Sequence, residues 1–293
     1  MPAVTTWDDV DVVIDLGSRL GEGPLWDHRE GLLAWVDILA GLVHFTDPGT
    51  GVTTTVPVGT DVGAIALHGE SGYLLAVRRG FATLESARVD VVNEVLDADG
   101  QRMNDGALDP AGRFVAGSIT DDRSPTGALY VRELDGEVRT LFGGVTVSNG
   151  LAWNAAGDRL FYVDSPLQGI DVMDYDVETG TVSDRRRWAT VPESDGIPDG
   201  LTIDDEGCLW LALFGGGKVL RYSPDGTLTG EVRLPVSRIT SCAFGGPDLD
   251  RLFITTAGVG SSPDDPPRPH DGALFVVDPG AVGVPSVVAG DRP

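Results

Sequence analysis

One pattern of hydrophobic and polar residues recurs along the chain: two apolar residues, a polar turn that contains aspartate or glycine, and a second short apolar run. A clear copy has Ala152 and Trp153 before the turn and residues 160–163 after it. A strand, an Asp/Gly turn and a second strand rich in β-branched and aromatic residues form a β-hairpin. We call the residue directly before each turn its mark residue. The mark residues are Trp26, Leu67, Leu108, Trp153, Ile203 and Phe244, so six hairpins are predicted.

The spacing of these hairpins predicts the fold. The mark residues are 41, 41, 45, 50 and 41 positions apart. A third strand led by glycine follows each hairpin, at residues 41–45, 80–84, 127–131, 169–173, 217–222 and 272–277. A fourth strand follows most of these, for example at residues 52–56. Units of about 40–50 residues with four strands have the size of a β-propeller blade. We therefore predict an all-β fold, a six-bladed β-propeller with four-stranded antiparallel blades.

The N-terminal part of the chain offers a way to close the ring. Residues 10–16 form a spare strand before the first hairpin. We expect this N-terminal strand to join the last blade, because an open ring would leave a bare sheet edge. No linker stands out between the repeats, so residues 1–293 are expected to form a single propeller domain.

Composition agrees with this architecture and excludes several kinds of partner. The chain has 40 glycines and 19 prolines in 293 residues, which is typical of many tight turns between short strands. It has 45 acidic against 21 basic residues, a net charge of −24 at pH 7. Phosphate groups would repel such a chain, so neither nucleic acid nor a membrane surface is an expected partner. No protein partner is evident, and acidic pairs such as Asp204-Asp205 are expected to be solvated turn residues.

The same residues indicate a compartment. The N-terminal residues lack the basic start and apolar run of a signal peptide. The longest apolar stretch, residues 32–45, contains Asp37 and His44 and is too short to cross a bilayer. The two cysteines, Cys208 and Cys242, do not form a disulfide framework and are expected to be small buried apolar residues. We therefore expect a cytoplasmic protein.

Candidate functional residues lie four positions before the mark residues. These positions hold Glu22, Gly63, Asn104, Asn149, Asp199 and Thr240. Equivalent positions lie at one height around a propeller. Four carboxylates or carboxamides would therefore surround the mouth of the central channel if the strands that contain the mark residues are innermost. A single Asn-Gly or Asp-Gly pair is usually only a turn former, but the shared phase in four repeats favours a shared site. Buried acids repel one another, so a cation is expected between them.

The donor atoms restrict the kind of ion. Carboxylate and carboxamide oxygens are hard ligands, which suit Ca²⁺, Mg²⁺ or Mn²⁺ with open positions for water. The four histidines, His28, His44, His68 and His270, share no phase of the repeat. A histidine-rich zinc site is therefore disfavoured, although Zn²⁺ itself stays possible. We expect one divalent metal ion, Ca, Zn, Mn or Mg.

An ordered series of motifs carries these residues: LGEGPLW at 20–26, RMNDG at 102–106, DPAGR at 109–113, SNGL at 148–151 and IPDG at 197–200. The series resembles the senescence marker protein/gluconolactonase/regucalcin-like family, which includes sugar lactonases, and the resemblance runs from about residue 20 to about residue 290. It implies a six-bladed propeller with Glu22, Asn149 and Asp199 as metal ligands. Arg102 and Asn104 match substrate-binding positions of the family. Asp122 falls where the family can carry an acidic substrate contact, and the short loop leaves Asp121 as the other candidate.

The resemblance implies a metal-dependent lactonase that opens a sugar lactone to the aldonic acid, for example a glucono-, xylono-, arabino- or galactonolactone. The ion would polarise the lactone carbonyl and lower the pKa of a bound water. Asp199 would hold the ion, and it is a candidate general base as well as a ligand. Arg102 and Asn104 would orient sugar hydroxyls.

Two other functions fit the same residues. One is another metal-dependent lactonase or esterase, or a phosphotriesterase, of the paraoxonase type. The other is a calcium-binding propeller without turnover, since propellers commonly serve as binding platforms. The sequence contains no Gly-x-Ser-x-Gly motif, so serine esterase chemistry is not expected.

Overall fold

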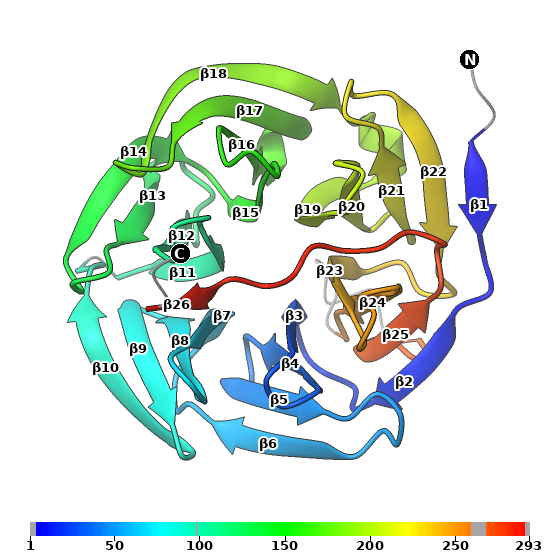
Figure 1. Ribbon diagram of the computed structural model, residues 1–293, viewed down its shortest axis with the longest axis horizontal. Helices are drawn as coiled ribbons and strands as arrows, with labels where there is room; N and C mark the ends of the chain where they lie inside the picture. The colour runs from blue at the N-terminus through cyan, green and yellow to red at the C-terminus, as the bar shows by residue number, and fades with distance from the viewer. Residues whose placement is uncertain (1–3, 98, 259–267, 291–293) are drawn as a thin grey trace.

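The computed structural model describes residues 4–97, 99–258 and 268–290. Their strands form six sheets arranged in a ring around a central channel, as Figure 1 shows. The predicted six-bladed β-propeller is thereby confirmed. The innermost strands are β3 (Gly21–Asp27), β7 (Val62–His68), β11 (Gln101–Leu108), β15 (Ser148–Trp153), β19 (Ile197–Ile203) and β23 (Ile239–Gly245). Each contains one of the six mark residues.

The remaining strands build each blade outward in antiparallel order. The second strands are β4 (Leu32–Asp37), β8 (Gly72–Val77), β12 (Phe114–Thr120), β16 (Arg159–Asp164), β20 (Leu209–Phe214) and β24 (Arg251–Thr256). The third strands are β5 (Leu42–Thr46), β9 (Gly80–Glu85), β13 (Gly127–Arg132), β17 (Gly169–Asp176), β21 (Lys218–Tyr222) and β25 (Ala273–Val277). The first five blades end with β6 (Thr53–Pro57), β10 (Arg88–Glu94), β14 (Val138–Val145), β18 (Thr181–Thr190) and β22 (Leu228–Arg233). Two short 3₁₀ turns, η1 (Ser165–Leu167) and η2 (Glu193–Asp195), follow β16 and β18.

The N-terminal strand closes the ring as predicted. Strand β2 (Asp11–Asp15) pairs antiparallel with β25 and is the outermost strand of the last blade. Strand β1 (Thr5–Trp7), which precedes β2 in the chain, pairs parallel with β22 of the fifth blade. There the ring of Trp7 packs on that of Trp210, with the ring centroids 5.4 Å apart. The N-terminal segment therefore ties the last blade to the one before it.

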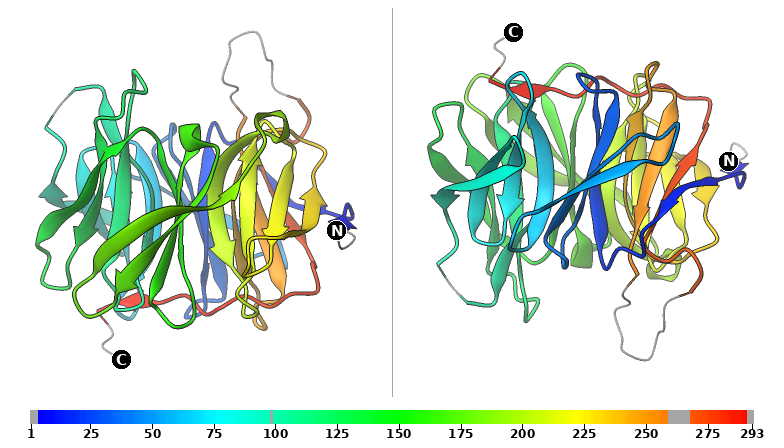
Figure 2. Two further views of the ribbon diagram at one scale, coloured as in Figure 1. Left: turned by 90° about the horizontal axis from the view of Figure 1, so that it is seen from above. Right: turned by 90° about the horizontal axis from the view of Figure 1, so that it is seen from below.

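The C-terminal segment crosses one end of the channel, from the last blade to the second (Figures 1 and 2). Gly283 forms an isolated bridge with Asp204 at the end of β19. Strand β26 (Val288–Ala289) then pairs parallel with β7. We call residues 278–290 the C-terminal strap. It covers the end of the channel at which the innermost strands finish, and the predicted polar residues lie near the opposite end, where these strands begin.

The apolar core lies between neighbouring blades rather than in one central cluster. One such cluster joins Val163 and Val172 of the fourth blade to Leu211 and Leu213 of the fifth, and five further clusters fill the other interfaces among the described residues. Cys208 and Cys242 are both buried free thiols, as expected. No helix in the described part of the chain is long and apolar enough to span a membrane.

Candidate metal centre

Four polar residues of equal phase meet where the innermost strands begin. Glu22 is the second residue of β3, Asn104 the fourth of β11, Asn149 the second of β15 and Asp199 the third of β19. The pairing with the second strand shifts register next to each of them. Such irregularities bend a strand and redirect its side chains. All four residues are buried, with exposed fractions of 5–7%.

The glycines that follow these residues allow neighbouring strands to approach closely. A Cβ atom at Gly150 would lie 2.6 Å from the backbone nitrogen of Leu201 on the next innermost strand. A Cβ at Gly200 would collide with the side chain of Ser241 on the strand after that. A side chain at either position would push the strands apart and widen the ring of polar groups. The Asn-Gly and Asp-Gly pairs are therefore packing features here, not turn formers.

Hydrogen bonds connect three of the predicted substrate and metal positions. Arg102 Nη1 donates to Asn104 Oδ1 at 2.6 Å. Asn104 Nδ2 donates to Asn149 Oδ1 at 2.9 Å and to the carbonyl of Ser148 at 2.7 Å. Asn149 Nδ2 in turn donates to Ser165 Oγ at 2.7 Å. Both amide donors of Asn104 are therefore used within the protein, and its oxygen keeps one lone pair for a ligand.

The carboxylates carry an electrostatic penalty that a cation would relieve. Burial, and then repulsion by Asp199 and Asp105, raises the pKa of Glu22 well above its usual range. Burial, and then repulsion by Asp105, does the same to the pKa of Asp199. Burial raises the pKa of Asp105 to about 6, although its carboxylate accepts a hydrogen bond from the Gly106 amide. Three acids that act on one another at the centre of a ring favour a bound cation.

Two arginines add positive charge beside these acids. Burial lowers the pKa of Arg102, while Asp61 and Glu22 oppose that shift. Arg123, on the loop after β12, helps to hold down the pKa of Asp199. In the described part of the chain neither guanidinium forms an ion pair within 4 Å of a carboxylate. Both therefore remain available to a ligand.

The structure does not bring Asp122 into this cluster. Its carboxylate is exposed and accepts a hydrogen bond from the Ser124 amide at 3.0 Å. That hydrogen bond lowers the pKa of Asp122. Its neighbour Asp121 is among the acids that act on the pKa of Arg102. Asp105 and Arg123 were not predicted, because Asp105 lies one position out of phase and Arg123 lies on a loop outside the repeat.

A second group of potential ligands has a different explanation. Ligand atoms of Asp204, Glu206 and Cys208 lie within 4.8 Å of one another. The Arg221 guanidinium already pairs with Asp204 at 3.0 Å and with Glu206 at 2.6 Å. Asp204 is only 1% exposed and also accepts a hydrogen bond from Trp210 Nε1. The expectation that Asp204 is a solvated turn acid is wrong, and its charge is neutralised without a metal.

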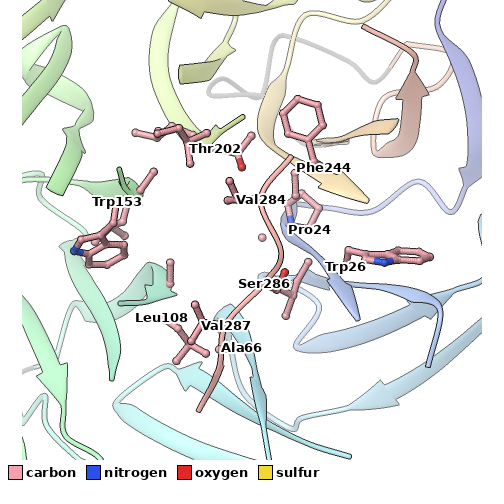
Figure 3. Close-up of a pocket in the computed structure, with 18 of the residues that line it drawn as sticks. Pro24, Trp26, Ala66, Leu108, Trp153, Thr202, Phe244, Val284, Ser286 and Val287 are labelled. Carbon is pink, nitrogen blue, oxygen red and sulfur yellow. The ribbon is translucent and has the colours of Figure 1, made fainter. Parts of the chain in front are cut away.

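The channel contains a cavity of about 330 Å³ between the polar cluster and the C-terminal strap (Figure 3). Its walls are mostly apolar and include Trp153, Leu108 and Phe244, with Val287 of the strap across it. Asp105 also lines this cavity. Asp105 therefore meets an apolar interior on one side, which agrees with burial as the first cause of its raised pKa.

The fold and the site together define a known class of propeller. Residues 20–258 match the model of the SMP-30/gluconolactonase/LRE-like region, and the chain belongs to this family. Regucalcin of Xenopus laevis is 37% identical over 279 residues, which cover 92% of this chain and 93% of that protein. The pentonolactonase of Haloferax volcanii is 38% identical over 288 residues, 93% of this chain and 95% of that protein. A solved calcium-binding protein, regucalcin, from Agrobacterium tumefaciens covers 99% of both chains with a TM-score of 0.91 and 25% identity.

Proposed function

We propose that this protein opens a sugar lactone to the corresponding aldonic acid, with one divalent ion held by Glu22, Asn149 and Asp199. The observation that carries the proposal is the convergence of two buried carboxylates and one carboxamide at the end of the channel opposite the C-terminal strap. A pentonolactonase among the relatives supports a five- or six-carbon aldonolactone, such as a glucono-, xylono-, arabino- or galactonolactone, as the substrate. A cytoplasmic location belongs to the same proposal, supported by the two buried free thiols.

The donor set fits a hard divalent ion. Carboxylate and amide oxygens are the ligands that Ca²⁺, Mg²⁺ and Mn²⁺ prefer, and Zn²⁺ also accepts carboxylates. When bound, such an ion would polarise the lactone carbonyl and favour ionisation of a water. The raised pKa values of Glu22 and Asp199 indicate that this set of side chains is unfavourable without a positive charge.

The chain's own side chains would perform the remaining tasks. Asp199 would accept the proton of the attacking water, because a carboxylate that holds the ion would also lie beside that water. Arg102 would donate hydrogen bonds to sugar hydroxyls and attract the product carboxylate. Asn104 would accept a hydrogen bond from a substrate hydroxyl through the free lone pair of its amide oxygen. Asp122 remains a proposed substrate contact. Its carboxylate is exposed and lies outside the cluster, so only the outer part of a substrate would reach it.

The first test is the substitution Asp199→Ala. It should abolish ion retention, measured by elemental analysis, and reduce lactone hydrolysis by about 10²–10⁴-fold in a pH-indicator assay over a panel of lactones. Asp205→Ala is the matched control, because Asp205 is exposed and lies six residues further along the chain. An Asp199→Ala variant that turns over lactones without bound metal would refute the mechanism.

The calcium-binding function is the second candidate, because the solved relative from Agrobacterium tumefaciens is described as a calcium-binding protein. The same panel separates the two functions when it is run with and without a chelator. Acid release that stops with chelator supports the lactonase. Ion binding without acid release from any lactone supports the binding protein.

A further inference from the structure

The polar cluster contains a chain of four hydrogen bonds that runs from the third blade to the fifth. Arg102 Nη1 donates to Asn104 Oδ1 at 2.6 Å, and Asn104 Nδ2 donates to Asn149 Oδ1 at 2.9 Å. Asn149 Nδ2 donates to Ser165 Oγ at 2.7 Å, and Ser165 Oγ donates to the carbonyl of Pro198 at 2.6 Å. Asn104, Asn149 and Ser165 are each at most 6% exposed. Bulk water is therefore a poor substitute for any of these partners.

The donor-to-acceptor direction of this series of hydrogen bonds is fixed at both ends. A guanidinium can only donate hydrogen bonds, and a backbone carbonyl can only accept them. Each amide between Arg102 and Pro198 must therefore present its oxygen toward Arg102 and its nitrogen toward Ser165. Reversing one amide would place two donors or two acceptors against each other in a buried site, which costs the desolvation of unpaired groups. The chain thus determines which end of Asn149 is oxygen.

This orientation matters because only the oxygen of an amide binds a cation. Asn149 Oδ1 has two lone pairs, and Asn104 uses one of them. The second lone pair is left for the proposed ion. A reversed Asn149 would present an NH₂ group there, which repels a cation and cannot act as a ligand.

Ser165 is the residue of this hydrogen-bond series that contacts both β15, which carries Asn149, and β19, which carries Asp199. It is the first residue of η1, directly after β16, and is 4% exposed. Its hydroxyl accepts from Asn149 and donates to the carbonyl of Pro198, the residue before Asp199. We propose that Ser165 is a positioning residue of the ion site, which holds the Asn149 oxygen toward the ion. This inference rests on the ion site of the proposed function.

The direct test is the ion affinity of Ser165→Ala. Chelator-stripped protein is titrated with Mn²⁺ or Ca²⁺ in a calorimeter, and the variant should bind about 10–100-fold more weakly, as is typical when a partner of a ligand is removed. Thr46→Val is the matched control. Thr46 is a buried hydroxyl on β5 that bonds to Trp35 Nε1 at 3.0 Å and to Thr53, in the outer part of the first blade. This control should lose stability but keep the ion affinity of the unchanged protein.

A double-mutant cycle separates orientation from general stability. In an Asn149→Asp background both ends of the side chain are acceptors, so there is no reversed state to prevent. Ser165→Ala should then not lower ion affinity by more than about threefold, because the hydroxyl, whose hydrogen goes to the Pro198 carbonyl, is no longer a needed partner of residue 149. Ser165→Thr, which keeps the hydroxyl, should restore binding to within about threefold of the unchanged protein. If Ser165→Ala does not fold, Ser165→Cys gives the same comparison, because a thiol is a weak donor and acceptor.

The outcomes are distinct. Ion affinity that is unchanged in Ser165→Ala, or that Ser165→Ala lowers equally with and without the Asn149→Asp substitution, would overturn the positioning role and leave the ion site standing. Failure of the unchanged protein to bind any divalent ion would overturn the proposed function, and the positioning role with it.

Discussion

The charge state of the residues at the channel mouth governs how the protein behaves without metal. Glu22, Asp105 and Asp199 all have pKa values above those of exposed acids, with burial as the first cause. A carboxyl whose pKa is raised by folding stabilises the folded protein only while it is protonated. That contribution is complete below the pKa of the unfolded chain and is lost as the pH rises through the pKa of the folded protein.

Asp105→Asn should therefore make the chelator-treated protein more stable at neutral and higher pH. The pKa of Asp105 is about 6 against an ordinary 3.8, so its ionisation weakens the fold between about pH 4 and pH 7. We expect the variant to be more stable by about 1–3 kcal/mol at pH 8 and nearly unchanged at pH 4. Urea unfolding at both pH values, with Asp205→Asn as the exposed control, measures the difference. A variant that is less stable at pH 8 would show that the carboxylate is favourable there.

At the scale of residues, the shared phase of the repeat predicted which side chains gather at the channel mouth, and it gave no information about residues out of phase. Glu22, Asn104, Asn149 and Asp199 were singled out because equal phase in a propeller means equal height in the ring. The assignment of ligands among them, and of Arg102 to the substrate, came from the family resemblance. Ser165 lies on another strand connection and acts through a backbone carbonyl, so no spacing reveals it. Asp122 was placed by resemblance alone, and its carboxylate binds its own turn instead of the cluster.

At the scale of strands, an aspartate at the end of an innermost strand joins neighbouring blades. Asp27 ends β3 and accepts a hydrogen bond from Tyr73 of the second blade at 2.5 Å. Asp109 directly follows β11 and accepts one from Tyr175 of the fourth blade at 2.6 Å. Each aspartate also pairs with an arginine, Arg29 or Arg113. The repeated acid is therefore part of the interface between blades.

Asp109→Ala should destabilise the protein by about 1–3 kcal/mol, because it removes the buried acceptor of the Tyr175 hydroxyl and one of the two carboxylates that pair with Arg113, while Glu133 stays in place. Asp174→Ala is the control, since Asp174 pairs with Arg186 at the surface with 54% of its side chain exposed. An exposed pair is worth about 0–1 kcal/mol. Urea unfolding of both variants measures the contrast. Equal losses would show that burial of the Asp109 pair has no energetic importance.

The strands within each blade were predictable because every blade repeats the same hairpin and third strand. The exceptions are β1 and β26, which pair parallel to strands of other blades. Both occur once, at the ends of the chain, so the repeat carries no information about them. Two blades therefore have a fifth strand that the repeat did not predict.

For the whole molecule, closure of the ring depends on the N-terminal segment. Deletion of residues 1–16 removes β1 and β2 and leaves the edge of β25 bare. Bare strand edges pair with other molecules. We expect this deletion to lower the melting temperature and to cause self-association in size-exclusion chromatography with light scattering.

Deletion of residues 1–9 is the control for this prediction, because it removes β1 and keeps β2. It loses the packing of Trp7 on Trp210 but leaves the last blade complete. This variant should be destabilised less than the longer deletion, and it should stay monodisperse. A longer deletion with unchanged melting temperature and no association would show that β2 is not needed to close the ring.

The central claim is that Glu22, Asn149 and Asp199 bind one divalent ion at the end of the channel opposite the C-terminal strap. Its most direct test is an anomalous difference map from crystals grown with Mn²⁺. The account predicts one strong peak within about 2.0–2.6 Å of an oxygen of each of the three side chains. A map with no peak between them, or with its only peak elsewhere, such as beside Asp204 and Glu206, would contradict it.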